Sequence, residues 1–183
     1  MDPSADSAAK IARFEATVLP HLDAAYNLAR WMTRNATDGE DVAQEAMLRA
    51  FRFFDTFRGE DGRVWLMTIV RNTYLTWIRR QMPQQNVAEF DERVHTAIEA
   101  ALTPESEFLR QATSEQVRRA IEQLPPEYRE VILMRELEQM SYSEIAAVMQ
   151  SPLGTVMSRI SRARSMLRQL IAGARRAEVK HHV

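Results

Sequence analysis

The segment Ser141–Leu167 constrains the fold most, because two short helices with strong start signals follow one another across a tight turn. Ser141 and Glu144 have the spacing of a capping box, in which each side chain bonds a backbone N–H at the helix start. Ser151–Pro152 is a second start signal, with serine as N-cap and proline at the first helical position. This arrangement is typical of a helix-turn-helix, whose second helix enters the DNA major groove.

The second helix of this pair has two distinct faces. Apolar residues at i, i+4, i+7 and i+11 predict one buried face, made of Val156, Ile160, Ala163 and Leu167. Another face carries short polar residues and arginines, namely Thr155, Ser158, Arg159 and Arg162. Arginine can fork onto guanine, and hydroxyl groups suit phosphates or base edges, so this face is predicted to bind DNA. An ordinary helical hairpin with a solvated basic face is the alternative.

Composition favours an all-α fold and argues against an enzyme. Glycine and proline are few, at 5 and 7 residues, and no segment alternates with period two as a half-buried strand does. The chain has no cysteine, and its four histidines are scattered or terminal. It shows no nucleophile–base pair, no phosphate-cradling glycine loop and no metal-ligand cluster, so we expect no catalytic activity, cofactor or metal.

Targeting signals are missing from the sequence. No stretch approaches about 18 uninterrupted apolar residues, the length that indicates a transmembrane helix. The polar, acidic N-terminus is unlike a signal peptide. We therefore expect a cytoplasmic protein without membrane insertion.

Charge is unevenly distributed along the chain, although the net charge is only −1. The stretch 83–103 is acidic and poor in large apolar residues, whereas arginines concentrate near the C-terminus. This pattern predicts two small helical domains, residues 10–82 and 104–176, joined by a flexible acidic linker at 83–103. The second domain contains the helix-turn-helix.

Several further helices are expected from apolar periodicity. In the first domain the pattern predicts Phe14–Asn35, Glu40–Phe54 and Arg63–Gln81, with Asp38 as a cap for the second of them. In the second domain it predicts Phe108–Leu124 and Glu127–Leu137, separated at a proline pair.

Two helices of the first domain carry surfaces of interest. On the helix Glu40–Phe54, Asp41, Gln44, Glu45 and Leu48 share a face that can dock a protein partner or simply be solvated. On Arg63–Gln81, a polar stripe runs beside tryptophan, tyrosine and arginine side chains. Such aromatics can stack on exposed bases, but aromatics at helical spacing more often belong to a core.

Three segments in this order resemble the sigma factors of bacterial RNA polymerase, in particular the extracytoplasmic-function group of the sigma-70 family. DVAQEAMLRAFRFF (Asp41–Phe54) is similar to that family's core-polymerase-binding helix, and VWLMTIVRNTYLTWIRRQ (Val64–Gln81) to its −10 recognition helix. The segment Leu124–Leu167 is similar to its −35-binding domain. The resemblance covers about Phe14 to Leu170.

The resemblance implies a role for each segment. Contacts to core polymerase, through its beta and beta-prime subunits, would come from Asp41, Gln44, Glu45, Leu48 and Arg49. Contacts to the −10 DNA would come from Arg58, Arg63, Asn72, Thr76, Arg79 and Arg80. Contacts to the −35 DNA would come from Thr155, Ser158, Arg159, Ser161 and Arg162. The family also implies an anti-sigma factor as a partner, released by a signal, and a linker that passes near the RNA exit path.

A second hypothesis is a self-sufficient helix-turn-helix repressor or activator. Such a protein binds a palindrome as a dimer, with half-sites about one helical turn apart. The chain shows no obvious dimer seam, and its first half matches the polymerase-binding pattern instead.

Overall fold

The computed structural model describes residues 3–59, 61–81 and 113–181, and these form helices and turns without a strand, as predicted. The N-terminal domain contains α1 (Pro3–Val18), η1 (Leu19–His21), α2 (Leu22–Thr33), α3 (Ala36–Phe53), η2 (Phe54–Thr56) and α4 (Gly62–Gln81). The C-terminal domain contains α6 (Ser114–Gln123), α7 (Pro126–Ile132), η3 (Leu133–Leu137), α8 (Tyr142–Met149) and α9 (Leu153–His181). The predicted linker and the start of the predicted helix Phe108–Leu124 lie outside the described residues.

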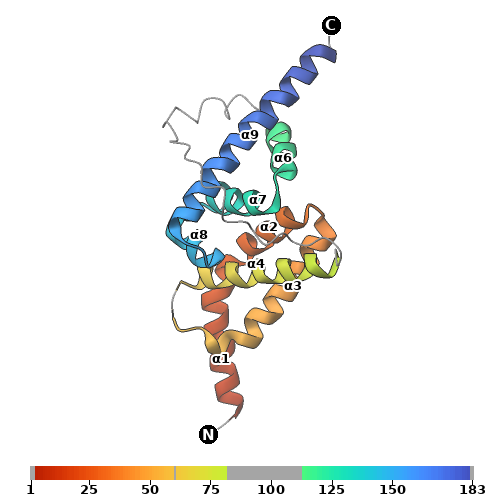
Figure 1. Cartoon of the computed structure of the whole chain (residues 1–183). Coiled ribbons are helices and arrows are strands. Elements are labelled where there is room, and N and C mark those ends of the chain that lie inside the picture. Colours follow the sequence, from red (N-terminus) through yellow and green to blue (C-terminus); the bar gives the residue numbers. More distant parts are fainter. Residues whose placement is uncertain (1–2, 60, 82–112, 182–183) are drawn as a thin grey trace.

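The N-terminal domain is a bundle in which α3 packs against α2 and α4 (Figure 1). Its core is apolar and tightly closed, with Leu28, Val42, Leu66 and Val70 almost fully buried. Helices α2 and α3 approach so closely that a Cβ added to Gly39 would lie 2.6 Å from the Cα of Arg30. Glycine is therefore required at this crossing for steric reasons.

Two helix boundaries in this domain differ from the prediction. The predicted helix Phe14–Asn35 is divided, because Pro20 has no N–H to donate and lies in the 3₁₀ turn η1. Helix α3 begins at Ala36, four residues earlier than predicted. Its cap is Asn35, whose side chain accepts from the backbone N–H groups of Thr37 and Asp38 at 2.9 and 3.4 Å.

The C-terminal domain contains the predicted helix-turn-helix, formed by α8 and α9. The backbone N–H of Ser141 donates to the Glu144 carboxylate at 2.6 Å, and the Glu144 N–H donates to the Ser141 hydroxyl, completing the capping box. Between the two helices, Gln150 adopts the left-handed conformation, with φ of 51°. The predicted apolar stripe of α9 is buried, and comprises Val156, Ile160, Ala163 and Leu167.

Ser151, predicted as the N-cap of the second helix, makes a different contact. The Ser151 hydroxyl donates to the carbonyl of Met149, so it binds the end of α8. Pro152 precedes α9, and its carbonyl accepts the Val156 N–H at 3.2 Å. Proline here fixes the backbone for the helix start without removing a needed donor.

The two domains pack against one another. Helix α4 lies across the middle of the molecule with α8 beside it, and α2 contacts α7 (Figure 1). The described N-terminal helix and the long helix α9 point to opposite ends of the molecule. Among the helices of residues 3–59, 61–81 and 113–181, none has both the length and the apolar content of a membrane span.

Candidate functional site

Helix α3 presents a mixed charged and apolar face to solvent. Val42 and Ala46 point into the core, which leaves Asp41, Gln44, Glu45 and Leu48 exposed on the other side. Leu48 is 66% exposed, and Phe51 and Phe53 of the same helix are exposed as well. The five residues predicted to bind polymerase are therefore together on one helix, and the fifth of them, Arg49, is half-buried.

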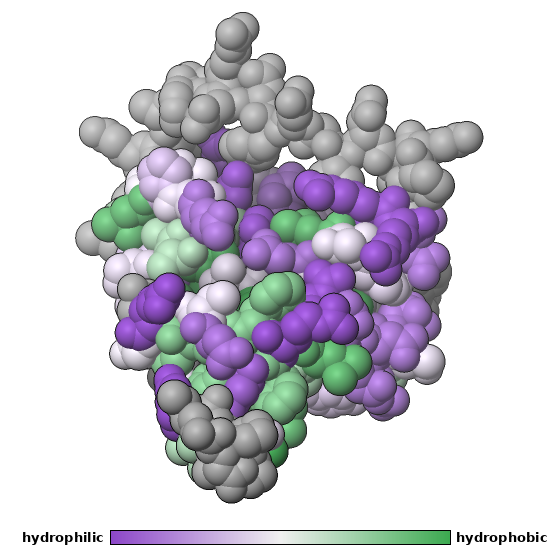
Figure 2. Space-filling view, turned by 90° about the horizontal axis from the view of Figure 1, so that it is seen from below, coloured by the Kyte–Doolittle hydropathy of each residue, from purple (hydrophilic) through white to green (hydrophobic). Residues whose placement is uncertain are grey.

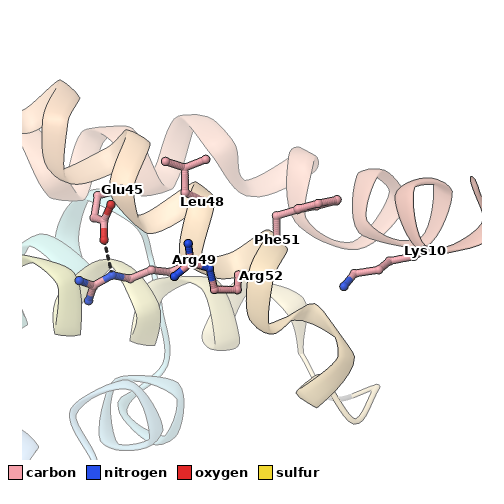
Figure 3. Close-up of a pocket in the computed structure, with 6 residues that line it drawn as sticks. All are labelled: Lys10, Glu45, Leu48, Arg49, Phe51 and Arg52. Atoms are coloured by element: carbon pink, nitrogen blue, oxygen red, sulfur yellow. Dashed lines mark hydrogen bonds and ion pairs between the residues drawn. The ribbon is translucent and has the colours of Figure 1, made fainter. Parts of the chain in front are cut away.

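A shallow pocket of about 490 Å³ follows this face (Figure 3). Lys10 of α1 lies at one end of the pocket. The carboxylate of Glu45 accepts a hydrogen bond from the Arg49 Nε at 2.7 Å. The remaining lining residues, Leu48, Phe51 and Arg52, all belong to α3. The pocket thus combines apolar and charged groups, the composition found at protein–protein contacts.

Apolar surface continues beyond the pocket. Figure 2, which views the molecule from the end where α1 and α3 lie, shows apolar patches between hydrophilic ones. The exposed large apolar residues of α1, η1, α2 and α3 are Ile11, Leu19, Leu22, Leu48, Phe51 and Phe53. An exposed apolar area of this kind on a folded domain marks a surface for a partner.

Helix α4 carries the polar stripe predicted from its sequence. Asn72 and Arg79 are exposed, and Thr76 lies between them with its hydroxyl donating to the Asn72 carbonyl at 2.9 Å. Arg80 and the loop residue Arg58 are also exposed. Four of these five side chains are therefore exposed to solvent, and Thr76 is half-buried.

The remaining α4 candidates are engaged within the protein. Arg63 forms an ion pair with Glu138 of the C-terminal domain, Nη2 to Oε2 at 3.3 Å, and also donates to the Glu138 carbonyl. Trp65 packs against Phe54 and Phe57, with ring centroids 6.0 and 5.4 Å away. For Trp65, the structure therefore favours the core interpretation over base stacking.

The predicted polar face of α9 is only partly exposed. Ser158 is exposed, whereas Thr155, Ser161 and Arg162 are half-buried. Arg159 differs from the others, since its side chain is only 12% exposed and its Nη1 lies 4.0 Å from the Glu130 carboxylate. Arg159 is thus turned toward the interior of its own domain.

Glu130 of α7 links helices α4 and α9, a contact that sequence reasoning missed. Both of its carboxylate oxygens accept from Arg71 of α4, at 2.8 and 3.3 Å, and Arg159 of α9 approaches from the other side. Its side chain is only 6% exposed. Burial raises the pKa of Glu130, and the charge of Arg71 acts in the opposite direction.

A second arginine, Arg129, connects the domains through backbone groups. Its guanidinium is buried and donates to the carbonyls of Ile121, Glu122 and Leu124, with Nη2 to Leu124 at 2.6 Å. A further bond, at 3.3 Å, reaches the carbonyl of Met32 in the other domain. Burial lowers the pKa of Arg129, and nearby Arg34 adds to this effect.

Arg34 makes a similar contact in the opposite direction, from the N-terminal domain to the C-terminal domain. Its guanidinium donates to the Glu122 carbonyl of the C-terminal domain at 3.0 Å. The residue itself closes α2 in the left-handed conformation, with φ of 61°. Neither Arg34 nor Arg129 was predicted from the sequence, because no local pattern indicates a bond from a side chain to a distant carbonyl.

The described residues were also searched for groups of side chains that could bind a metal ion. Within the part of the chain that the structure describes, no group of three or more histidine, cysteine, aspartate or glutamate residues is arranged to hold a metal ion.

Comparison with known families matches both halves of the chain. Residues 17–83 match the model described as sigma-70 region 2, and residues 114–167 match the model described as sigma-70, region 4. These matches correspond to the bundle that contains α3 and α4 and to the domain that contains the helix-turn-helix.

Individual relatives cover most of the chain. The extracytoplasmic-function RNA polymerase sigma-E factor of Haemophilus influenzae is 39% identical over 151 residues, 79% of this chain and 79% of that protein. The RNA polymerase sigma-H factor of Pseudomonas aeruginosa is 38% identical over 162 residues, 84% of this chain and 83% of that protein.

Solved structures show the same fold. The sigma factor RpoE in complex with the anti-sigma factor NepR from Bartonella quintana is similar with a TM-score of 0.68 and 25% identity, covering 87% of this chain and 97% of that one. CnrH in complex with the cytosolic domain of CnrY has a TM-score of 0.60 and 24% identity, covering 87% and 88%.

Proposed function

Because the chain belongs to the sigma-70 family of RNA polymerase sigma factors, in the extracytoplasmic-function group, we propose that α3, α4 and α9 bind core polymerase, the −10 element and the −35 element, respectively. Members of this family bind core RNA polymerase and direct promoter-specific initiation of transcription. The domain boundaries that we propose are 10–82 and 104–176, with 83–103 as the linker.

The observation that carries this assignment is the separation of three surfaces on three helices. The face of α3 mixes charge with exposed leucine and phenylalanine, which suits a protein partner. The faces of α4 and α9 are polar and carry arginine, which suits phosphates and base edges. The residues concerned are those predicted from the sequence, Asp41, Gln44, Glu45, Leu48 and Arg49 for polymerase, Arg58, Arg63, Asn72, Thr76, Arg79 and Arg80 for −10, and Thr155, Ser158, Arg159, Ser161 and Arg162 for −35.

The packed arrangement of the two domains must open for both promoter elements to be bound. The names −10 and −35 place the elements about 25 base pairs apart, which is about 85 Å at about 3.4 Å per pair. In the packed arrangement, Arg71 of α4 and Arg159 of α9 both approach the carboxylate of Glu130. The 31 residues between Gln81 and Thr113 span about 100 Å when fully extended, which is enough for this separation.

We also propose that an anti-sigma factor binds the packed arrangement. The RpoE structure that shares this fold was solved with the anti-sigma factor NepR, and the CnrH structure with the cytosolic domain of CnrY. A partner that bound the apolar end of the N-terminal domain would cover the α3 face and exclude core polymerase. The protein would act in the cytoplasm, without catalytic activity or a cofactor of its own.

Run-off transcription tests the function directly. The purified chain is mixed with sigma-free core polymerase and with DNA from upstream of its own operon. A specific start site that depends on the added chain supports the proposal. Tight binding to a palindrome without polymerase, together with no transcript, would support a self-sufficient repressor or activator instead.

A further inference from the structure

Two apolar side chains stand on the exposed surface at the start of α9. Leu153 and Met157 are 49% and 50% exposed, although the buried stripe of the same helix is complete without them. They are four residues apart, so they lie one above the other on one side of the helix. Single exposed apolar residues are common, but a pair one turn apart on the second helix of a helix-turn-helix calls for an explanation.

Their neighbours are small and polar. At about 100° per residue, Ser161 and Ser158 follow Met157 around the helix, and Arg159 lies on the far flank. Ser158 is exposed, with its hydroxyl directed to the Thr155 carbonyl at 2.9 Å, whereas Arg159 is turned toward Glu130. Leucine and methionine are longer than serine, so the apolar groups reach further from the helix than these serines do.

The major groove contains one apolar group that such side chains match. Thymine presents a C5-methyl group there, whereas the other bases present hydrogen-bond donors or acceptors that lose water against an apolar side chain. The N-terminal part of a recognition helix is the part that contacts base edges. Leu153 and Met157 are the first and fifth residues of α9.

We propose that Leu153 and Met157 select thymine in the −35 element by contact with its C5-methyl group. This inference rests on the proposed function of α9 and adds the chemistry by which one flank of that helix chooses its base pairs. It gives the helix two modes of recognition, with apolar contact on one flank and hydrogen bonding by hydroxyl and guanidinium groups on the other.

The first experiment identifies the base pairs concerned. Holoenzyme made from core polymerase and the full chain selects sequences from a promoter pool randomised across the −35 hexamer. The wild-type chain is expected to enrich thymine at one or two positions, and Met157→Ala or Leu153→Ala to relax that preference there. Leu137→Ala is the matched control, because Leu137 is comparably exposed in the same domain but lies outside α9. An unchanged preference in both α9 variants overturns the proposal.

The second experiment removes only the methyl group. Deoxyuridine replaces thymidine at each selected position, and holoenzyme binding is measured by fluorescence anisotropy. Wild-type affinity is expected to fall about fourfold, the effect of one apolar carbon leaving contact. The Met157→Ala or Leu153→Ala variant that faces this base is expected to show no further loss. An equal loss in the wild type and in both variants overturns the inference.

The outcome also separates this inference from the proposed function. A wild-type holoenzyme that starts transcription specifically but tolerates deoxyuridine refutes the methyl contact and leaves the function of the chain intact. A chain that forms no promoter-binding holoenzyme refutes the proposed function, and the methyl contact with it. Thermal unfolding of each variant, compared with the wild type, verifies that both substitutions leave the domain folded.

Discussion

Among single residues, Glu144 has the clearest dependence on pH. The hydroxyl and backbone N–H of Ser141 both lower the pKa of Glu144, because they bond its charged form. A lowered folded-state pKa means that the ionised carboxylate stabilises the fold above the ordinary glutamate pKa of about 4.3, and that this stabilisation is lost as pH falls below it.

Glu144→Gln retains a side-chain acceptor for the cap but cannot ionise. In chemical denaturation, the stability difference between wild type and variant should be constant above about pH 5 and shrink below about pH 4.3. A difference independent of pH would contradict this account.

Of the two α9 arginines proposed to bind the −35 element, Arg159 is turned toward Glu130, so Arg162 is the one to test first. If Arg162 forks onto a guanine, Arg162→Ala should weaken promoter binding by about 1–3 kcal/mol. Arg162→Lys separates base from phosphate contact, because lysine keeps the charge but loses the fork. We expect the lysine variant to lose nearly as much affinity as the alanine variant in holoenzyme binding assays. Affinity close to wild type in the lysine variant would assign Arg162 to phosphate.

At the level of secondary-structure elements, the crossing of α2 and α3 depends on a missing side chain. Gly39→Ala would place a methyl group 2.6 Å from the Cα of Arg30, so the helices must separate. Overpacking of this kind costs about 1–3 kcal/mol, which thermal unfolding should detect. Gly173→Ala in α9 is the matched control, because its added Cβ meets nothing within 4 Å and alanine favours a helix. Equal effects of the two substitutions would show that the crossing has room.

The exposed face of α3 gives a second prediction at the level of one helix. Asp41→Arg combined with Glu45→Arg reverses the charge of two exposed residues without touching the buried side of the helix. Core-polymerase binding should be abolished, whereas helical content and unfolding temperature should remain close to wild type. Arg162→Ala is the useful comparison, because it should leave core binding unchanged. The same defect in both variants, measured by core pull-down, would contradict the assignment of faces.

Local patterns predicted the elements but not their long-range contacts. The capping box of Ser141 and the buried stripe of α9 follow from spacing alone, since each involves residues within three or four positions. The α3 start was misplaced because Asn35, Asp38 and their neighbours offer competing caps. The Arg71–Glu130 pair joins residues 59 positions apart, and no periodicity links their two helices. Sequence reasoning therefore predicted three candidate surfaces, and the structure was needed to show that Glu130 links the helices α4 and α9 that carry two of them.

For the whole molecule, the Arg71–Glu130 pair should control how often the domains part. Arg71→Ala leaves a buried carboxylate without its closest partner, a loss worth about 3–5 kcal/mol to the packed arrangement. The chain has no cysteine, so dyes can be attached at Glu40→Cys and Gln169→Cys, two exposed positions in different domains. We expect Arg71→Ala to lower energy transfer between the dyes in the free protein. Arg118→Ala, which removes exposed ion pairs within α6, should not. Unchanged transfer in Arg71→Ala would show that other contacts hold the domains together.

The bonds that Arg34 and Arg129 make across the domain boundary end on backbone carbonyls, those of Glu122 and Met32. Every amino acid supplies a carbonyl, so these two bonds survive substitution of the accepting residue. The Arg71–Glu130 pair, in contrast, requires two particular side chains in two halves of the chain. Chimeras that exchange one domain with a relative should therefore keep the general geometry of domain packing. The packed arrangement should be weakened only where the new domain lacks the matching charge. Compatibility between halves during divergence would then depend on the charge pairs that cross the boundary, Arg71–Glu130 and Arg63–Glu138.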